Sequence, residues 1–292
     1  MRLLICAAAL AASLNVVVAE DRPAGPSLKV VWSVDKGLAV PESAHLDPET
    51  GFLFVSNIDG EGAKKDGNGY ISKLTPQGEV IAAKWATGLD APKGLRSAKG
   101  KLWISDIDQV VSISLADGKI VDRIAIEGAK FLNDVAAGPD GTVYVSDMPE
   151  SKIYAISGGK ATLFAEGEQL ESPNGLLVDG DRLLLAAWGY AADFMPKTPG
   201  RLLSLDLKTK QVTPITKTPT GNLDGIELDG RGGYVVTDWA AGKVFHISAS
   251  GEARVVGQFA KGTADHAYLP KEKLLILPQM MENRVVAYEL AP

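Results

Sequence analysis

The sequence predicts an all-β fold, a six-bladed β-propeller with four antiparallel strands in each blade. Three observations predict it. A short unit recurs six times at spacings of about 40 to 50 residues, which is the usual length of a propeller blade. Apolar and polar residues alternate in short runs bounded by Gly, Asp and Pro, as they do in hairpins. No stretch of useful length has the period of a helix.

The recurring unit begins with one polar residue and continues through an alternating run, a turn and a second run that ends in a small polar residue. In blade one the unit opens at Pro41-Glu42-Ser43, and its second run covers 52–57. Third and fourth runs follow the second run in most units. We call the opening polar residues the keyed residues: Glu42, Lys93, Asn133, Asn174, Asp224 and Asp265.

The two ends of the chain are predicted to close the ring together. Blade six runs out of chain after its third strand, at 284–289, whereas the run 28–34 is a strand without a blade. We expect this N-terminal strand to supply the missing outer strand of blade six, which leaves no unpaired edge there. Residues 20–292 are therefore expected to form a single propeller domain.

Residues 1–19 have the pattern of a secretory signal peptide. A positive start at Met1-Arg2 precedes an apolar stretch and a small-residue site that ends at Ala19. The protein is therefore expected to be periplasmic or secreted. The only cysteine, Cys6, lies inside this segment, so the mature chain is expected to have no disulfide, thiolate metal site or cysteine nucleophile.

Charge and motif content exclude several functional classes. The chain has a net charge of −6, a pI near 5.2 and no basic run, so we expect neither nucleic acid nor membrane as a partner. No G-x-S-x-G, G-x-x-x-x-G-K or H-E-x-x-H motif occurs, which argues against serine hydrolases, nucleotide hydrolases and zinc peptidases. A small-molecule partner remains.

The keyed residues are expected to converge at one end of the central channel, because the blades are related by rotation. The competing interpretation is that Asn174-Gly175 and Asp224-Gly225 are ordinary hairpin turns. Separate turns at 179–181 and 229–231 weaken that interpretation. Loops 58–69 and 189–200 should lie at the same end as a rim, with the aromatic residues Trp188, Tyr190 and Phe194 over the channel mouth. Three acids that end second strands are interpreted as turn or rim residues: Asp106, Asp147 and Asp238.

Four keyed residues form a candidate metal site. Glu42, Asn133, Asn174 and Asp224 offer only carboxylate and amide oxygens. Such ligands favour Ca²⁺, then Mg²⁺ or Mn²⁺, with Zn²⁺ less natural. Of the three histidines, His266 follows a keyed residue and is a candidate for proton transfer, while His45 and His246 are interpreted as packing or strand-face residues.

The keyed residues resemble those of the senescence marker protein 30, gluconolactonase and luciferin-regenerating-enzyme family of six-bladed propellers. The similarity lies in Pro41-Glu42, Leu132-Asn133-Asp134, Pro173-Asn174-Gly175 and Leu223-Asp224-Gly225, taken in order. It implies that Glu42, Asn174 and Asp224 bind a divalent cation and that Asn133 lies beside the metal and the substrate. The chain departs from the family's sugar-lactone hydrolases at Phe131, where those enzymes often carry Arg. Aldonolactone specificity is thereby put in question.

These observations lead to one functional hypothesis and one alternative. The hypothesis is metal-assisted hydrolysis of a small lactone or ester, with Asp224 as proton acceptor, Asp134 or His266 as substitutes for it, and Lys93 stabilising negative charge. The alternative is a non-catalytic exported propeller that binds a small molecule or a protein and carries a structural Ca²⁺.

Overall fold

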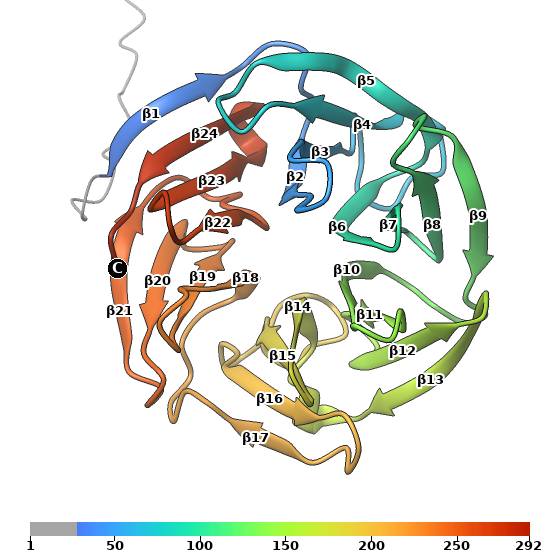
Figure 1. The fold of residues 1–292 in the computed structure, drawn as a ribbon. Coiled ribbons are helices and arrows are strands. Elements are labelled where there is room, and N and C mark those ends of the chain that lie inside the picture. Colours follow the sequence, from blue (N-terminus) through green and yellow to red (C-terminus); the bar gives the residue numbers. More distant parts are fainter. Residues whose placement is uncertain (1–27) are drawn as a thin grey trace, which may run out of the picture.

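The computed structural model describes residues 28–292. This part of the chain forms six four-stranded antiparallel sheets arranged as a ring around a central axis (Figure 1). The prediction of a six-bladed all-β propeller is confirmed. Within 28–292 the helical segments are two single 3₁₀ turns, η1 (Glu168–Leu170) and η2 (Met280–Glu282). No helix in this range is long and apolar enough to cross a membrane.

Each blade contributes its strands in chain order from the channel outward, and the N-terminal strand is the exception. Blades one to three comprise β2 (Pro41–Leu46), β3 (Leu53–Asn57), β4 (Gly69–Leu74) and β5 (Val80–Leu89); β6 (Pro92–Ala98), β7 (Lys101–Asp106), β8 (Gln109–Ser114) and β9 (Ile120–Ala125); β10 (Leu132–Ala137), β11 (Val143–Asp147), β12 (Lys152–Ser157) and β13 (Lys160–Glu166). Blades four to six comprise β14 (Pro173–Asp179), β15 (Arg182–Ala187), β16 (Leu202–Asp206) and β17 (Val212–Pro214); β18 (Leu223–Leu228), β19 (Tyr234–Asp238), β20 (Lys243–Ile247) and β21 (Ala253–Gln258); β22 (Ala267–Leu269), β23 (Leu274–Gln279), β24 (Arg284–Glu289) and β1 (Lys29–Val34).

The ring closes as the sequence predicts. Strand β1 pairs antiparallel with β24, from Lys29 opposite Glu289 to Val34 opposite Val285. The indole nitrogen of Trp32 also donates a hydrogen bond to the carbonyl of Pro76, 3.1 Å away in blade one. Both ends of the chain therefore hold the last blade together and join it to the first.

In residues 28–292 the buried hydrophobic side chains form seven clusters: six lie between neighbouring blades, and the seventh, which includes Ile58, Ile107 and Met280, lies at one end of the ring. For example, Phe54 and Ile71 of blade one pack with Leu102 and Ile104 of blade two. Both faces of the second strands are buried in this way, which explains why these strands are mostly apolar. Because the blades stack side by side, the core leaves the axis free for polar side chains.

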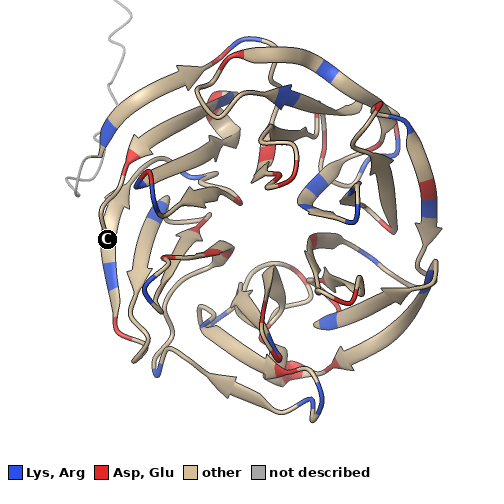
Figure 2. Ribbon diagram, viewed as in Figure 1, with Lys and Arg blue, Asp and Glu red and all other residues tan. Residues whose placement is uncertain are grey.

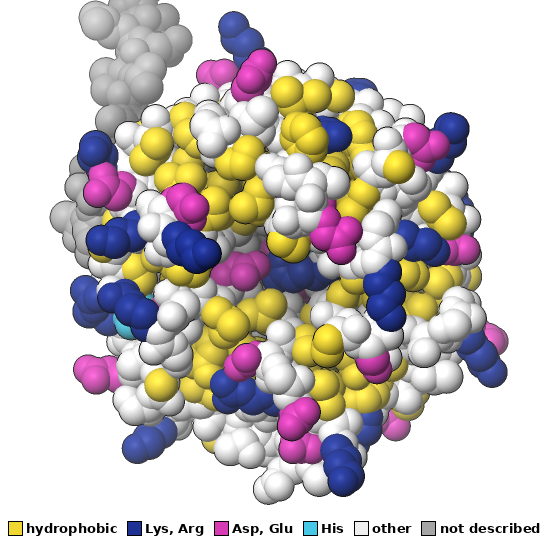
Figure 3. Space-filling model, viewed as in Figure 1, with side chains coloured by type: hydrophobic (Ala, Val, Ile, Leu, Met, Phe, Trp, Pro, Cys, Tyr) yellow, Lys and Arg dark blue, Asp and Glu magenta, His cyan; other side chains and the backbone are white. Residues whose placement is uncertain are grey.

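Charged residues of both signs are interspersed over the loops and outer strands, and several lie on strands that face the channel (Figure 2). Viewed along the axis, the end of the channel turned toward the viewer is hollow at its centre. Acidic and basic side chains lie deep in this hollow, and hydrophobic side chains surround it (Figure 3). The channel thus contains charged side chains that are shielded from bulk solvent.

Candidate functional site

A bulge at the start of five inner strands positions the keyed residues. Between the first two pairs of each ladder, the inner strand contains one residue more than the second strand that pairs with it. These bulges span Pro41 to Ala44, Pro92 to Leu95, Leu132 to Val135, Pro173 to Gly175 and Leu223 to Ile226. A bulge bends the strand and re-aims its side chains. The bulges contain Glu42, Lys93, Asn133, Asn174 and Asp224.

Hydroxyl groups of the second strands satisfy the backbone groups that the bulges leave unpaired. The N–H of Asp134 donates to the Ser146 hydroxyl at 3.0 Å, and the N–H of Gly225 donates to the Thr237 hydroxyl at 2.8 Å. Ser146 also donates to the carbonyl oxygen of Asn174 in the next blade at 2.8 Å. These buried hydroxyls fix the keyed residues relative to one another across blades.

The acids that end the second strands support the segments that lead into the inner strands. Asp106 accepts hydrogen bonds from the N–H groups of Asp90 and Ala91, and Asp147 accepts them from Lys130 and Phe131. Asp238 accepts one from Ala241. Their carboxylates are occupied by the backbone, in keeping with their interpretation as turn or rim residues.

Five of the six keyed residues line one pocket of about 540 Å³ at the end of the channel. They are Glu42, Lys93, Asn133, Asn174 and Asp224. Both long loops contribute to it as expected, through residues 58 and 60–63 of the first and Phe194 of the second. Asp265 does not line it. In blade six β22 starts after Asp265, whose backbone instead bridges to β2 through Glu42 and Ala44.

The burial of Glu42 and Asp224 in this pocket disfavours the ionised form of both carboxyl groups. Glu42 and Asp224 are only 5% and 4% exposed. Burial raises the pKa of Glu42 well above the usual carboxyl range, and the charges of Asp224 and Asp265 raise it further. The pKa of Asp224 is likewise raised well above its ordinary value by burial and by Asp265 and Asp134. A bound cation would relieve this repulsion.

Unsatisfied oxygen atoms lie beside the same carboxylates. Glu42 Oε2 and Asn174 Oδ1 are buried and have no hydrogen-bond partner. The amide nitrogen of Asn174 donates to the carbonyl of Leu223 at 3.2 Å, and the amide nitrogen of Asn133 contacts the sulfur of Met148 at 3.8 Å. Buried polar atoms are normally paired, so these oxygens fit a hard cation. Within residues 28–292 no cluster of three or more Asp, Glu, His or Cys side chains suits a metal, and the donor set accordingly depends on the amides.

Lys93 supplies a buried positive charge next to the acids. Its Nζ donates to the carbonyls of Gly62 at 2.8 Å and Ala91 at 3.1 Å, and it lies 4.3 Å from the centre of the Phe131 ring. Burial lowers the pKa of Lys93 to about 8, although Glu42 and Asp106 oppose the shift. The ammonium is therefore still largely protonated at neutral pH.

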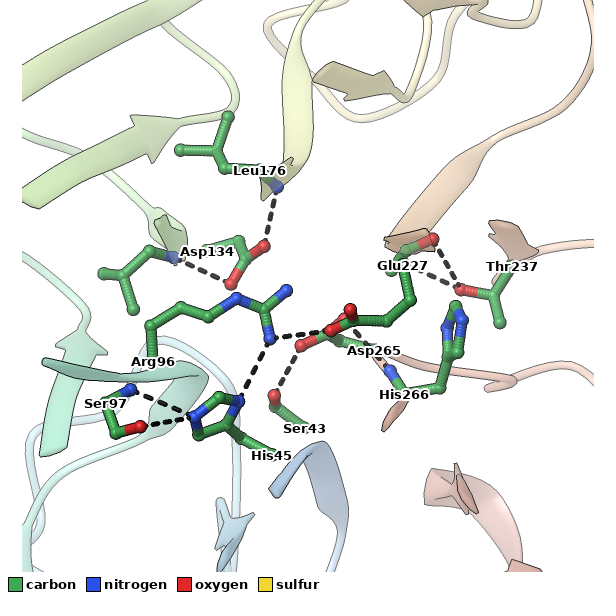
Figure 4. A network of polar contacts seen from close by, with 12 residues as sticks. Ser43, His45, Arg96, Ser97, Asp134, Leu176, Glu227, Thr237, Asp265 and His266 are labelled. Atoms are coloured by element: carbon green, nitrogen blue, oxygen red, sulfur yellow. Dashed lines mark hydrogen bonds and ion pairs between the residues drawn. The ribbon is translucent and has the colours of Figure 1, made fainter. Parts of the chain in front are cut away.

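Below the pocket, a second polar network surrounds Arg96 (Figure 4). Arg96 Nη1 lies 3.1 Å from Glu227 Oε1 and 3.4 Å from Nδ1 of His45. The Ser43 hydroxyl donates to Asp265 at 2.5 Å. His45, which we expected to be a packing or strand-face residue, lies on β2 and takes part in the channel network. His246, in contrast, lies on the face of β20 and contacts Asp229 at 2.9 Å.

The two alternative proton acceptors belong to this network and do not line the pocket. Both carboxylate oxygens of Asp134 accept backbone hydrogen bonds, from Val135 and from Leu176. His266 is fully buried, and burial together with the charge of Arg96 lowers its pKa to about 3. Both residues therefore lie outside the pocket, in the network beneath it (Figure 4).

The pocket walls are apolar. Many of their residues come from one equivalent position in each blade, which we did not single out in the sequence. It is the residue directly after the second strand: Ile58, Ile107, Met148, Trp188, Trp239 and Met280. All of them except Ile107 line the pocket. The repeat in the sequence could have identified this position, because it directly follows the polar residue that ends the second strand, such as Asn57, Asp106, Asp147 or Asp238. Tyr190, expected at the channel mouth, instead lines a separate surface pocket beside Glu171 and Arg201.

Comparisons with known proteins place the chain among propellers. A model of the SMP-30/gluconolactonase/LRE-like region matches residues 40–262. No curated protein matches the sequence. Among solved structures, a streptogramin B lyase is similar with a TM-score of 0.64, at 11% identity over 90% of this chain and 97% of the other. A catalytically inactive virginiamycin B lyase from Staphylococcus aureus with quinupristin has a TM-score of 0.60, at 14% identity over 89% and 98% of the two chains. At such identities these structures share the fold.

Proposed function

The chain belongs to the SMP-30/gluconolactonase/LRE-like family, and from this premise we propose that it is a divalent-metal-dependent hydrolase of a small lactone or ester. One observation carries the proposal. Glu42 Oε2 and Asn174 Oδ1 are buried without partners next to Asp224, at the base of a pocket open to a small molecule. Two buried acids and two amides in such a place are suited to a hard cation.

The residues that would hold the ion are Glu42, Asn174 and Asp224, with Asn133 beside them. All four offer oxygen, which favours Ca²⁺ over Mg²⁺, Mn²⁺ or Zn²⁺. When bound, such an ion polarises a carbonyl oxygen and makes a water molecule more acidic. Its double positive charge also balances Glu42 and Asp224, whose pKa values burial otherwise raises.

The protein's own groups would then carry the remaining work of hydrolysis. Asp224 accepts the proton of the attacking water at its carboxylate. The Lys93 ammonium provides positive charge close to the carbonyl oxygen on which negative charge develops. The apolar walls exclude bulk water, which strengthens both interactions. Asp134 and His266 receive no proton in this scheme, because Asp134 is saturated by backbone N–H groups and His266 lies outside the pocket.

Hydrolysis of a panel of alkyl lactones, aldonolactones and aryl esters by the mature protein tests this proposal. The protein is assayed after metal removal and after Ca²⁺ loading, together with Asp224→Asn and the surface control Asp117→Asn. We expect turnover that requires metal, survives Asp117→Asn and is lost in Asp224→Asn. Mass analysis should show the addition of one water, because a lyase would instead give products isomeric with the substrate.

Folded, Ca²⁺-loaded protein that turns over no member of the panel would contradict the hydrolase. Tight Ca²⁺ binding in that case would favour the alternative, a non-catalytic binding propeller with a structural ion.

We also propose that the protein is exported to the periplasm or beyond the cell. Positively charged Met1-Arg2, the apolar stretch and the small-residue site at Ala19 support it; these residues lie outside the described part of the structure. N-terminal sequencing of protein from cell fractions tests this, with Glu20 expected as the first residue. Full-length protein confined to the cytoplasm would refute export.

A further inference from the structure

We propose that the ligand of this pocket is a lactone or ester bearing an alkyl or aryl group, and that Phe131 and Phe194 select it against polyhydroxylated sugar lactones. The inference rests on the proposed function, because it takes the pocket above Glu42 and Asp224 as the reacting site. It adds the chemical class of the substrate and the residues that determine it.

The walls of the pocket can offer a ligand little besides apolar contact. The indole N–H of Trp188 already donates to the carbonyl of Phe194 at 3.1 Å, and that of Trp239 points at the sulfur of Met280 at 3.0 Å. The two rings lie 5.9 Å apart. Although both tryptophans line the pocket, the indole N–H, the only polar group of each side chain, is already engaged with Phe194 or Met280. A sugar hydroxyl on this wall would lose water and gain no hydrogen bond.

Polar side chains are confined to the base of the pocket, apart from Glu61 on the rim loop. At the base, Lys93 already donates to Gly62 and Ala91. This arrangement suits a molecule with one polar end, such as an ester carbonyl, and an apolar remainder. A lactone with hydroxyls on every carbon lacks such a division.

Phe131 and Phe194 form an aromatic pair at this site. Their rings meet edge to face with centres 5.2 Å apart, and the face of Phe131 covers the Lys93 ammonium at 4.3 Å. Phe131 therefore presents an apolar ring to the pocket, at a position that offers no hydrogen bond to a ligand hydroxyl.

The backbone conformation of Phe194 is unfavourable for a phenylalanine, so surrounding contacts must hold it in place. Its φ is +62°, a left-handed conformation that bulky residues rarely adopt. The Trp188 indole fixes this position by its hydrogen bond to the Phe194 carbonyl. Strained residues of this kind concentrate at ligand sites, and Phe194 lines the pocket while its neighbour Met195 is exposed.

Binding of lactams tests the substrate class separately from catalysis, because lactams resist hydrolysis. Alkyl γ-lactams from ethyl to octyl and gluconolactam are titrated calorimetrically into the mature protein, with and without Ca²⁺. We expect affinity to rise about three- to fourfold for each added methylene until the pocket is filled, and gluconolactam to show no saturable binding.

Two variants and a matched control identify the residues responsible. Phe194→Asn removes the ring while Asn tolerates the left-handed backbone, and we expect octyl-lactam binding to weaken about tenfold. Tyr190→Asn is the control, since Tyr190 is an exposed aromatic of the same loop that lines another pocket; its affinity should match the wild type. Phe131→Arg should weaken alkyl-lactam binding and allow gluconolactam to bind.

Affinities that do not depend on alkyl length, or gluconolactam bound as tightly as octyl-lactam, would overturn the inference. Equal losses in Phe194→Asn and Tyr190→Asn would do the same, and this pair decides the matter even if Phe131→Arg does not fold. Lactam binding with the expected pattern but no lactone turnover would refute the hydrolase and leave the ligand class standing.

Discussion

Arg96 and Glu227 form a 3.1 Å ion pair across the channel, from inner strands in opposite blades of the ring. Their side chains are only 7% and 21% exposed. Asp134 and Asp265 also act on the charge of Arg96. One guanidinium therefore balances several buried acids directly beneath the candidate site.

Arg96→Met should destabilise the protein by about 3 to 5 kcal/mol, because it leaves buried carboxylates without their cation. Urea unfolding in the absence of metal measures the change. Adding Glu227→Gln to this variant should recover part of the loss. The control Arg182→Met, which breaks the half-exposed pair with Asp179, should lower stability by no more than about 1 kcal/mol. A loss of similar size in both single variants would show that Arg96 has no special role.

Removing one acid from the pocket should stabilise the metal-free protein and abolish its response to Ca²⁺. Burial and mutual repulsion raise the pKa values of Glu42 and Asp224, so Glu42→Gln, which removes one of the two repelling acids, should raise the free energy of unfolding of the metal-free protein. Ca²⁺ at a hundred times its dissociation constant should stabilise the wild type by about 2.7 kcal/mol, or about 5 to 10 °C in Tm.

Scanning calorimetry with and without Ca²⁺ measures both effects. Asp117→Asn, on the surface, should keep the full Ca²⁺ response. A Glu42→Gln protein that still gains the wild-type Tm increment would remove Glu42 from the metal site.

Two buried groups should give the stability of the metal-free protein opposite dependences on pH. His266 has its pKa lowered to about 3 by burial and by Arg96, so only the unfolded chain takes up its proton as the pH falls below about 6.5. Stability from His266 is therefore lost on acidification between about 6.5 and 3. Burial raises the pKa of Glu227 from 4.5 to about 7, so its contribution is full below 4.5 and is lost as the pH rises through about 7.

Urea unfolding at a series of pH values separates the two groups. His266→Asn should flatten the loss of stability toward low pH, and Glu227→Gln should flatten the decline toward neutral pH. A profile of either variant that runs parallel to the wild type would show that the group concerned does not titrate in this way.

Some residues of the site can be predicted from the sequence and others cannot, because their positions have different physical causes. The keyed residues could be aligned from the sequence because each opens a blade, and rotation brings equivalent positions together. The network around Arg96 could not be predicted in this way, because Arg96 has the sequence pattern of an exposed residue in an alternating strand. Only the bulge after Lys93 and the ring geometry direct it toward Glu227. Yet Arg96, Glu227 and His45 all lie three residues after a keyed residue, a regularity that the repeat contains.

Asp265 shows the limit of the repeat itself. Blade six lacks the bulge found in the other five, and its inner strand is short. Alignment of the blades predicted an equivalent place for Asp265, but bridging of its backbone to blade one overrides that register. Likewise, the apolar walls and the Phe131–Phe194 contact depend on how the rim loops fold over the channel, which no strand period encodes.

Ser146 should prove necessary for the geometry of the site as well as for stability. Its buried hydroxyl accepts the N–H of Asp134 and donates to the carbonyl of Asn174, so it joins the backbones that carry two of the candidate ligands. Ser146→Ala leaves both backbone groups unpaired, which should lower stability by about 1 to 3 kcal/mol. Because partners behind a ligand typically contribute about 10- to 100-fold to metal affinity, Ca²⁺ binding should weaken by at least about tenfold.

Calorimetric titration with Ca²⁺ and urea unfolding measure these two effects on the same protein samples. Ser157→Ala, an exposed serine at the end of β12 in the same blade, should alter stability by no more than about 0.5 kcal/mol and leave Ca²⁺ affinity unchanged. If Ser146→Ala lowered stability while Ca²⁺ affinity stayed at the wild-type value, the hydroxyl would support the sheet alone. Asn133 and Asn174 would then be held by their own side-chain contacts, with Met148 and with the carbonyl of Leu223.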